Sequence, residues 1–287
     1  SPVQPSIHSK AEGHLMGTNS RVRNNVRILG NPDGPVLMFA HGFGCDQGMW
    51  RRVLPYFTAD YRVVLFDHVG AGGSDKGAYN PAKYSSLEGY VEDLLEICAE
   101  LDLREVTFVG HSVSAMMAVA AGAADPARFA NLVLLASSPS YMDRPEDGYR
   151  GGFTSADIDE LLTSLDANYI VWAAAMAPMI MGNPGSPELH NELEGSFCRL
   201  DPAVARDFAR VSFCSDVRGQ LPEVKVRSLI LQCSQDLLAP PHIGVYTRDL
   251  MPEATLVQLH ATGHLPHVSA PAETATAILA FLAGTPL

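Results

Sequence analysis

The chain has 287 residues, of which 47% are apolar and 18% charged, and its 32 acidic and 20 basic side chains give a net charge of −12. This composition is typical of a folded globular protein, and the length allows either two domains or one large α/β domain with an insertion. The acidic balance, without any basic run, argues against nucleic acid and anionic membranes as partners. No apolar stretch reaches the roughly 20 residues that a membrane-spanning helix needs.

The N-terminal residues and the cysteines bear on the compartment. Residues 1–20 lack the apolar segment of a secretory signal, so we expect an N-terminal tail, with Met16 as a candidate for the native first residue. The five cysteines are odd in number and contain no C-x-x-C pair, which argues against a disulfide framework and a structural zinc site. No His, Asp or Glu cluster has metal-ligand spacing. We therefore expect a cytoplasmic protein with reduced thiols and no metal or other cofactor.

Six short apolar runs recur along the chain without alternating polar residues. They cover residues 36–40, 63–66, 106–109, 132–135, 229–232 and 255–259. Runs of this kind predict strands that are buried on both faces. Amphipathic stretches such as 87–101, with apolar residues at helical spacing, lie between them. The alternation predicts a mostly parallel sheet with helices on both faces.

This alternation stops between about residues 139 and 225. Four helix-like stretches, near 154–165, 168–181, 187–199 and 202–214, are separated there by Gly, Pro and Asn. We predict a core formed by 21–138 and 226–287, interrupted by a helical cap at 139–225. Residues 143–225 hold 14 acidic and 7 basic side chains, so the cap carries more than half of the negative charge. A solvated outer face explains this charge, and an acidic docking face for a protein partner is the alternative.

The most specific motif is Gly110-His111-Ser112-Val113-Ser114, where a buried strand ends and an Ala- and Met-rich helix begins. A nucleophilic serine on such a sharp turn needs small neighbours two residues to either side, because the strand and helix backbones nearly touch. Gly110 meets this need, whereas Ser114 replaces the second Gly of the general G-x-S-x-G pattern. We predict Ser112 as a nucleophile, and the alternative is a purely structural turn.

The segment His41-Gly42-Phe43-Gly44 follows the strand at 36–40. Acyl transfer generates an oxyanion, which two preorganised backbone N–H donors stabilise best. In this architecture one donor follows the nucleophile and the other lies in the loop after an earlier strand. The amides of Val113 and Phe43 are therefore predicted to form an oxyanion hole.

A serine nucleophile needs a general base and a carboxylate that orients the base, in the chain order Ser, Asp or Glu, His. Asp236 follows the strand at 229–232, and His264 follows the strand at 255–259. Both lie at the carboxyl edge of the predicted sheet, where sites assemble in open α/β folds. We predict a triad of Ser112, Asp236 and His264.

Other residues compete for two of these roles. His267 and, less strongly, His260 are alternatives for the base, and Asp143 is an alternative for the acid. Asp67, in contrast, is expected to stabilise the glycine-rich turn at 67–74. That turn lacks the spacing of a dinucleotide-binding fingerprint.

Four motifs, HGFGCDQ (41–47), VGHSVSAM (109–116), NYIVWA (168–173) and GHLPHVS (263–269), together resemble the α/β-hydrolases that include the bacterial stress regulator RsbQ and the plant strigolactone and karrikin receptors. The resemblance covers roughly residues 22–283. Ser114 fits this group, because the plant receptors carry GHSVSAM. The resemblance implies the α/β-hydrolase fold, the Ser112–Asp236–His264 triad, the Phe43 and Val113 oxyanion hole, and a four-helix cap over an apolar pocket.

These features predict a serine hydrolase of small esters or lactones that forms an acyl-enzyme. Hydrolysis of a carbon–carbon bond with the same triad is one alternative. Another is a signalling protein that senses a small molecule, hydrolyses it slowly and engages a protein partner through its cap. Apolar cap residues are candidates to bind the substrate, or else they pack the cap against the core: Tyr169, Trp172, Met176, Phe213, and also Met179, Ile180 and Phe208.

Overall fold

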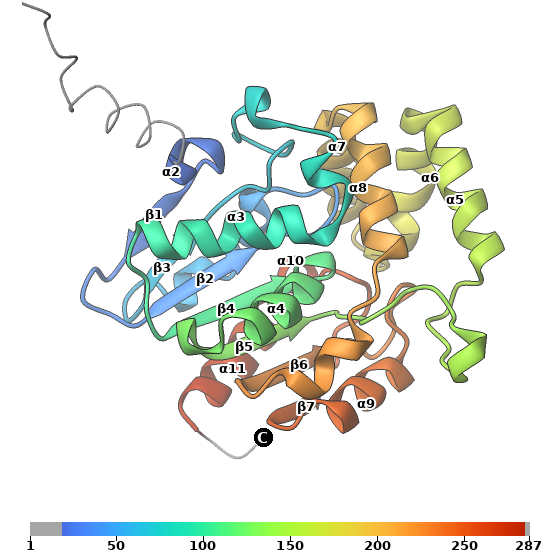
Figure 1. Cartoon of the computed structure of the whole chain (residues 1–287). Helices are drawn as coiled ribbons and strands as arrows, with labels where there is room; N and C mark the ends of the chain where they lie inside the picture. The colour runs from blue at the N-terminus through green and yellow to red at the C-terminus, as the bar shows by residue number, and fades with distance from the viewer. Residues whose placement is uncertain (1–18, 285–287) are drawn as a thin grey trace, which may run out of the picture.

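A computed structural model describes residues 19–284 of the chain (Figure 1). Met16 and all but the last two residues of the predicted tail lie outside this range. The centre is a seven-stranded sheet in the order β1-β3-β2-β4-β5-β6-β7. Its strands are β1 (Arg27–Gly30), β2 (Val36–Ala40), β3 (Arg62–Leu65), β4 (Val106–His111), β5 (Phe129–Leu135), β6 (Arg227–Gln232) and β7 (Ala254–Gln258).

The prediction of a mostly parallel sheet is confirmed. Every neighbouring pair is parallel except β1 and β3, which are antiparallel. The edge strand β1 was not among the predicted strands. It has only four residues, none of them fully buried, so it lacks the apolar run by which the other strands were identified.

Both faces of the sheet are covered, which explains why the strand sequences do not alternate. On β2, Leu37 and Phe39 belong to one buried apolar cluster, whereas Met38 and Ala40 belong to a second cluster on the opposite face. Helices α3 (Leu87–Glu100) and α4 (Val113–Ala124) contribute to the cluster of Met38, and α11 (Pro271–Leu282) contributes to the cluster of Phe39.

Four helices lie between β5 and β6 and gather beyond one end of the sheet (Figure 1). They are α5 (Ser155–Ala167), α6 (Tyr169–Met181), α7 (Pro187–Arg199) and α8 (Pro202–Cys214). Side chains of Thr154, Asn168 and Asp201 cap the first, second and fourth of them at their N-termini. The predicted four-helix insertion is thus present.

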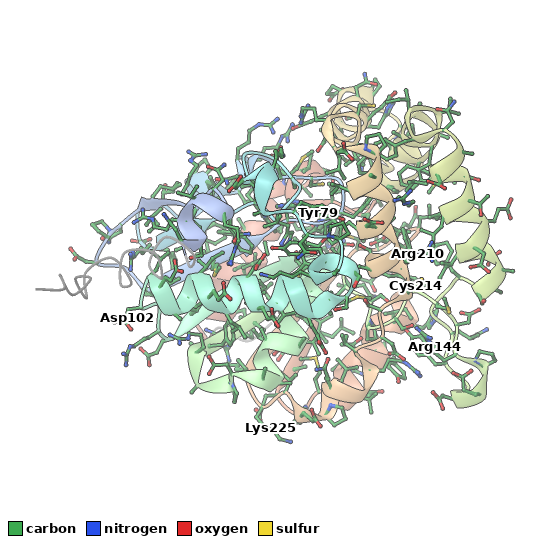
Figure 2. The ribbon with its side chains drawn as sticks, turned by 45° about the horizontal axis from the view of Figure 1, so that its top comes forward. Tyr79, Asp102, Arg144, Arg210, Cys214 and Lys225 are labelled. Atoms are coloured by element: carbon green, nitrogen blue, oxygen red, sulfur yellow. The ribbon has the colours of Figure 1, made fainter. Side chains whose placement is uncertain are left out.

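The two connections between this cap and the core contact each other. Arg144, on the way into the cap, donates to the Cys214 carbonyl at 3.4 Å and pairs with Asp216 at 3.7 Å, on the way out (Figure 2). The other α-helices within residues 19–284 are α2 (Ser20–Arg23), α9 (Pro241–Leu250) and α10 (Pro266–Ser269). Short 3₁₀ helices are η1 (Gln47–Trp50), η2 (Leu54–Tyr56), η3 (Lys76–Ala78), η4 (Lys83–Ser85), η5 (Pro126–Arg128), η6 (Pro145–Asp147) and η7 (Arg218–Glu223). Within residues 19–284, none of the helices is long and apolar enough to cross a membrane.

Candidate active site

The predicted nucleophile lies on a sharp turn between β4 and α4. Ser112 has φ 58° and ψ −116°, a left-handed conformation that non-glycine residues rarely adopt. A Cβ atom on Gly110 would lie 2.3 Å from the Ser114 carbonyl oxygen, so only glycine fits at that position. The positive φ of Ser112 therefore stores strain of roughly 1–3 kcal/mol.

A continuous chain of hydrogen bonds joins Ser112, His264 and Asp236. The Ser112 Oγ lies 2.7 Å from His264 Nε2, and His264 Nδ1 lies 2.8 Å and 3.0 Å from the two Asp236 carboxylate oxygens. The backbone amides of Leu238 and Ala239 also donate to Asp236. Because the carboxylate only accepts, His264 carries its proton on Nδ1, and Nε2 is free to accept the proton of Ser112.

These three residues follow β4, β6 and β7 at the carboxyl edge of the sheet. The loop of His264 is held on both sides. The Gly263 amide donates to the Gln235 carbonyl at 2.7 Å, and the His264 amide donates to the Ile180 carbonyl of the cap at 2.9 Å. The side chains of His264 and Asp236 are 4% and 0% exposed, so their hydrogen bonds are largely shielded from water.

The two predicted oxyanion donors lie on different segments: the Val113 amide directly follows Ser112, and the Phe43 amide is in the loop after β2. Val113 is the first residue of α4, so its N–H points out of the positively polarised helix end. In the described part of the chain, neither the Val113 nor the Phe43 N–H donates a hydrogen bond to a protein acceptor. The Phe43 ring packs among three aromatic rings of the cap, those of Trp172, Phe197 and Phe208.

Tyr141 is a neighbour of Ser112 that the sequence analysis missed. Its hydroxyl lies 2.9 Å from the Ser112 Oγ, and burial raises its pKa, so the phenol is neutral. Since the Ser112 proton is directed at His264, the Tyr141 O–H donates to the Ser112 Oγ. The residue belongs to the connection from β5 into the cap, and no motif surrounds it. The signal in the sequence that could have identified Tyr141 is its position in a connection that follows a strand next to β4.

A small, mostly apolar cavity of about 30 Å³ lies over Ser112 between core and cap. This is well below the roughly 300–1,000 Å³ of typical ligand pockets. Of the predicted cap residues, Trp172, Ile180 and Phe213 line the cavity. The lining residues are Phe43, Cys45, His111, Ser112, Tyr141, Trp172, Ile180, Leu193, Phe197, Ser212, Phe213, Leu238, His264 and Leu265.

Several other cap candidates lie outside this lining. Tyr169 stacks behind Trp172 and donates its hydroxyl to the Phe197 carbonyl at 2.6 Å. Met176 lines a separate groove between α5 and α6. Phe208 stacks on Tyr90, and Met179 is 56% exposed.

The alternative acid and bases lie apart from Ser112. His267 is fully buried against Trp50, its ring nitrogens have no hydrogen-bond partner among residues 19–284, and burial lowers its pKa to about 3. His260 is exposed, and Asp143 accepts a hydrogen bond from the Gly152 amide. Asp67 bonds the amides of Gln47 and Gly73 and thereby holds its turn. Within residues 19–284, no group of three or more His, Cys, Asp or Glu residues is placed to hold a metal ion.

Known proteins resemble the chain over most of its length. Residues 37–277 match the alpha/beta hydrolase family. A strigolactone esterase from Arabidopsis thaliana is 37% identical over 252 residues, covering 88% of this chain and 93% of that protein. A karrikin insensitive 2 receptor from Petunia hybrida is 36% identical over 249 residues, covering 86% and 91%.

A solved structure agrees with these sequence matches. A hydrolase from Oleispira antarctica superposes with a TM-score of 0.89 at 40% identity, covering 93% of this chain and 97% of that one. Because the family match spans most of the chain and the sheet has the expected parallel order, this chain belongs to the alpha/beta hydrolase family.

Proposed function

We propose that the chain hydrolyses small esters or lactones through a covalent acyl-enzyme on Ser112. The observation that carries this proposal is the hydrogen-bonded chain from the Ser112 hydroxyl through His264 to Asp236. A general base within hydrogen-bond reach of the nucleophile, itself oriented by a buried carboxylate, is the arrangement that activates a serine.

In the first half of the reaction, His264 Nε2 takes the Ser112 proton while the Ser112 Oγ forms a bond to the substrate carbonyl carbon. The carbonyl oxygen becomes an oxyanion, which the Phe43 and Val113 amides stabilise. Asp236 stabilises the imidazolium. When the carbon–oxygen bond to the leaving group breaks, His264 gives its proton to the leaving alkoxide, and the acyl group remains on Ser112.

In the second half, His264 takes a proton from water as the water oxygen attacks the acyl carbon. The tetrahedral intermediate collapses, His264 returns the proton to the Ser112 Oγ, and the free acid leaves. For a lactone the alcohol and the acid are parts of one molecule, so ring opening gives a hydroxy acid as the single product.

The substrate class follows from the cavity and from the relatives. The cavity is lined mostly by aromatic and aliphatic side chains, which favours apolar acyl groups over charged ones. Relatives with similar sequences over most of the chain are named strigolactone esterases, which supports an ester or lactone as the substrate.

The test compares wild type with Ser112→Ala on p-nitrophenyl acetate, on longer p-nitrophenyl esters and on a fluorogenic butenolide. Loss of the nucleophile should lower kcat by about 10⁴-fold or more. Ser228→Ala is the matched control. Ser228 is buried like Ser112, but it lies on β6 away from the site, where its hydroxyl donates to a backbone carbonyl. Undiminished hydrolysis by a folded Ser112→Ala protein would refute the proposal.

A second candidate function is signalling through a protein partner on the cap, and helix α6 favours it. The exposed residues of α6 are all apolar: Ile170, Val171, Ala174, Ala175 and Met179. Ile170, Val171 and Met179 are 56%, 61% and 56% exposed. A helix that is apolar on every side is normally covered, and one relative is named a receptor.

The groove between α5 and α6 is lined by apolar residues such as Leu161, Val171 and Met176, and also by Asp157 and Glu160. A partner that presents an apolar surface with basic residues beside it would match this chemistry. The discriminating test complements a gene-deletion strain with Ser112→Ala or Val171→Glu. If only Ser112→Ala fails, turnover is the function. If only Val171→Glu fails, the function is binding of a partner.

A further inference from the structure

Ser114 occupies the position where the general nucleophile motif has glycine, and its hydroxyl both donates and accepts a hydrogen bond. The side chain is completely buried, and its Oγ donates to the His41 carbonyl at 2.5 Å. The ring nitrogen Nε2 of His68 lies 2.8 Å from the same Oγ and 3.1 Å from the same carbonyl. The Ser112 turn, the loop after β2 and the loop after β3 therefore meet at one carbonyl group.

We propose that Ser114 and His68 are positioning residues that hold the oxyanion loop, residues 41–45, so that the Phe43 N–H points at the developing oxyanion. This role rests on the proposed function, since it concerns the same reaction. We call the hydrogen bonds of Ser114 and His68 to the His41 carbonyl the loop brace.

The hydrogen-bond pattern defines the protonation state of both histidines. The His68 backbone N–H donates to His41 Nε2 at 3.0 Å, so that nitrogen is bare and the proton of His41 lies on Nδ1. His41 Nδ1 then donates to the Gly42 carbonyl at 2.9 Å. On His68, Nε2 carries the proton, because it faces a carbonyl oxygen and a hydroxyl oxygen that already donates its own proton. Burial lowers the pKa of both rings, so both stay neutral and keep these roles.

The loop is held on the other side of Phe43 as well. The Ser196 hydroxyl, on α7 of the cap, donates to the Gly44 carbonyl at 2.5 Å, and the Cys45 amide donates to the Gly42 carbonyl at 3.2 Å. Phe43 thus lies between an anchor from the core and an anchor from the cap. Its own amide is left without a protein acceptor in the described part of the chain, as an oxyanion donor requires.

The brace matters because oxyanion stabilisation is sensitive to position. Donors act at 2.7–3.1 Å from the oxyanion, and removal of one donor from such a site costs roughly 10²- to 10³-fold in kcat. Loss of the Ser114 hydroxyl loosens one anchor and leaves the donor present. We therefore expect a smaller loss, about 10- to 100-fold in kcat, with little change in KM.

The experiment compares Ser114→Ala, Ser114→Gly and Ser114→Cys with Ser228→Ala, the matched buried serine. The glycine variant separates the need for a small residue at this position from the need for the hydroxyl. The general motif predicts that Ser114→Gly retains activity, whereas the brace predicts a loss of kcat equal to that of Ser114→Ala. Cysteine keeps a weak donor in a somewhat larger side chain, so its loss of kcat should be intermediate.

Inhibition by a short alkyl boronic acid reports on the oxyanion hole directly, because its tetrahedral adduct with Ser112 places an oxygen there. The inhibition constant should rise by the same factor by which kcat/KM falls, while Ser228→Ala leaves both unchanged. Hydrolysis and inhibition within twofold of Ser228→Ala in both Ser114→Ala and Ser114→Gly would overturn the proposal.

Hydrogen exchange of the amides of residues 41–45 tests the brace without any substrate. We expect faster exchange in Ser114→Ala than in wild type and no change in Ser228→Ala. If Ser112→Ala retains hydrolysis, the proposed function fails, and the exchange result alone then decides the brace. Unchanged exchange across residues 41–45 would contradict it in either case.

Discussion

The two walls of the cavity differ in chemistry. The core side supplies polar groups at strand ends, and Ser112, His264 and Asp236 are fully hydrogen-bonded to one another. The cap side supplies aromatic rings, such as those of Trp172 and Phe213, and it is hydrogen-bonded to the proposed triad through the Ile180 backbone carbonyl and through Tyr141, on the connection into the cap. The difference suggests a division of labour, in which the core determines the rate of the chemical steps and the cap determines which molecules enter.

The largest effect is expected from a variant that disrupts the hydrogen bonds on the core side of the cavity. Asp236→Asn replaces an acceptor by an amide that can donate, which favours the wrong tautomer of His264, so kcat should fall by about 10⁴-fold. Steady-state kinetics on p-nitrophenyl acetate measure this. Asp143→Asn is the matched control for the alternative acid and should keep kcat within twofold. A loss below tenfold in Asp236→Asn would assign the orienting role elsewhere.

The next variant enlarges the cavity on its cap side. Trp172→Ala removes a large ring from the cavity wall and should cost about 3–5 kcal/mol of the free energy of unfolding. It should also move the preference among p-nitrophenyl esters toward longer acyl chains. Chemical denaturation and a chain-length series measure the two effects.

Tyr169→Phe is the control for this cap variant. It loses only the hydrogen bond to the Phe197 carbonyl, about 1 kcal/mol, and leaves the cavity wall in place. Its chain-length preference should match wild type. An unchanged preference in Trp172→Ala would mean that the cap does not select the substrate.

A pH experiment tests whether His267, a buried residue on the core side, is held in its neutral form. Burial, with contributions from His264 and Arg52, lowers the pKa of His267 from 6.5 to about 3. Between these values the unfolded chain binds a proton that the folded protein does not, so stability is lost as the pH falls below 6.5. From pH 7 to pH 5 this one residue should lower the free energy of unfolding by about 2 kcal/mol.

His267→Phe is the variant that tests this. Phenylalanine keeps the contact with Trp50 and removes no hydrogen bond, because neither ring nitrogen of His267 has a partner in the described structure. Its loss of stability between pH 7 and pH 5 should be about 2 kcal/mol smaller than that of wild type in urea denaturation. Parallel pH profiles of the two proteins would show that His267 is not buried in its neutral form.

The smallest effect belongs to the outer face of the cap. Val171→Glu lies in the first turn of α6, where an acidic side chain is favourable, so stability should change by less than about 0.5 kcal/mol. Ester hydrolysis should stay at the wild-type rate, since Val171 does not line the cavity. A clear fall in kcat would mean that the outer face of the cap is coupled to the chemistry.

Patterns that depend on local chemistry could be predicted from the sequence. Buried parallel strands produce continuous apolar runs, and the four cap helices are separated by Gly, Pro and Asn, so both were identified. The residues proposed as the triad come from three strand ends, and parallel topology brings such ends together. The edge strand β1 was missed because it is short and half exposed.

Features that depend on how loops and helices pack could not be predicted. The Tyr141 hydroxyl reaches Ser112 from the connection that follows β5, and the path of such a connection is set by tertiary packing. Tyr169 and Met176 have the same apolar character and helical spacing as Trp172, yet only Trp172 lines the cavity. Which face of a cap helix turns inward is a property of tertiary packing, and α6 offers no guide because it is apolar on all sides.

The central claim is that Ser112 carries a covalent acyl group during turnover. Protein quenched with acid while it hydrolyses p-nitrophenyl acetate can be digested and its peptides weighed by mass spectrometry. We predict one acetyl group on the peptide that contains Ser112, and none in Ser112→Ala treated in the same way. An acetyl group on another residue, or undiminished turnover without any acetylated Ser112 peptide, would contradict the account.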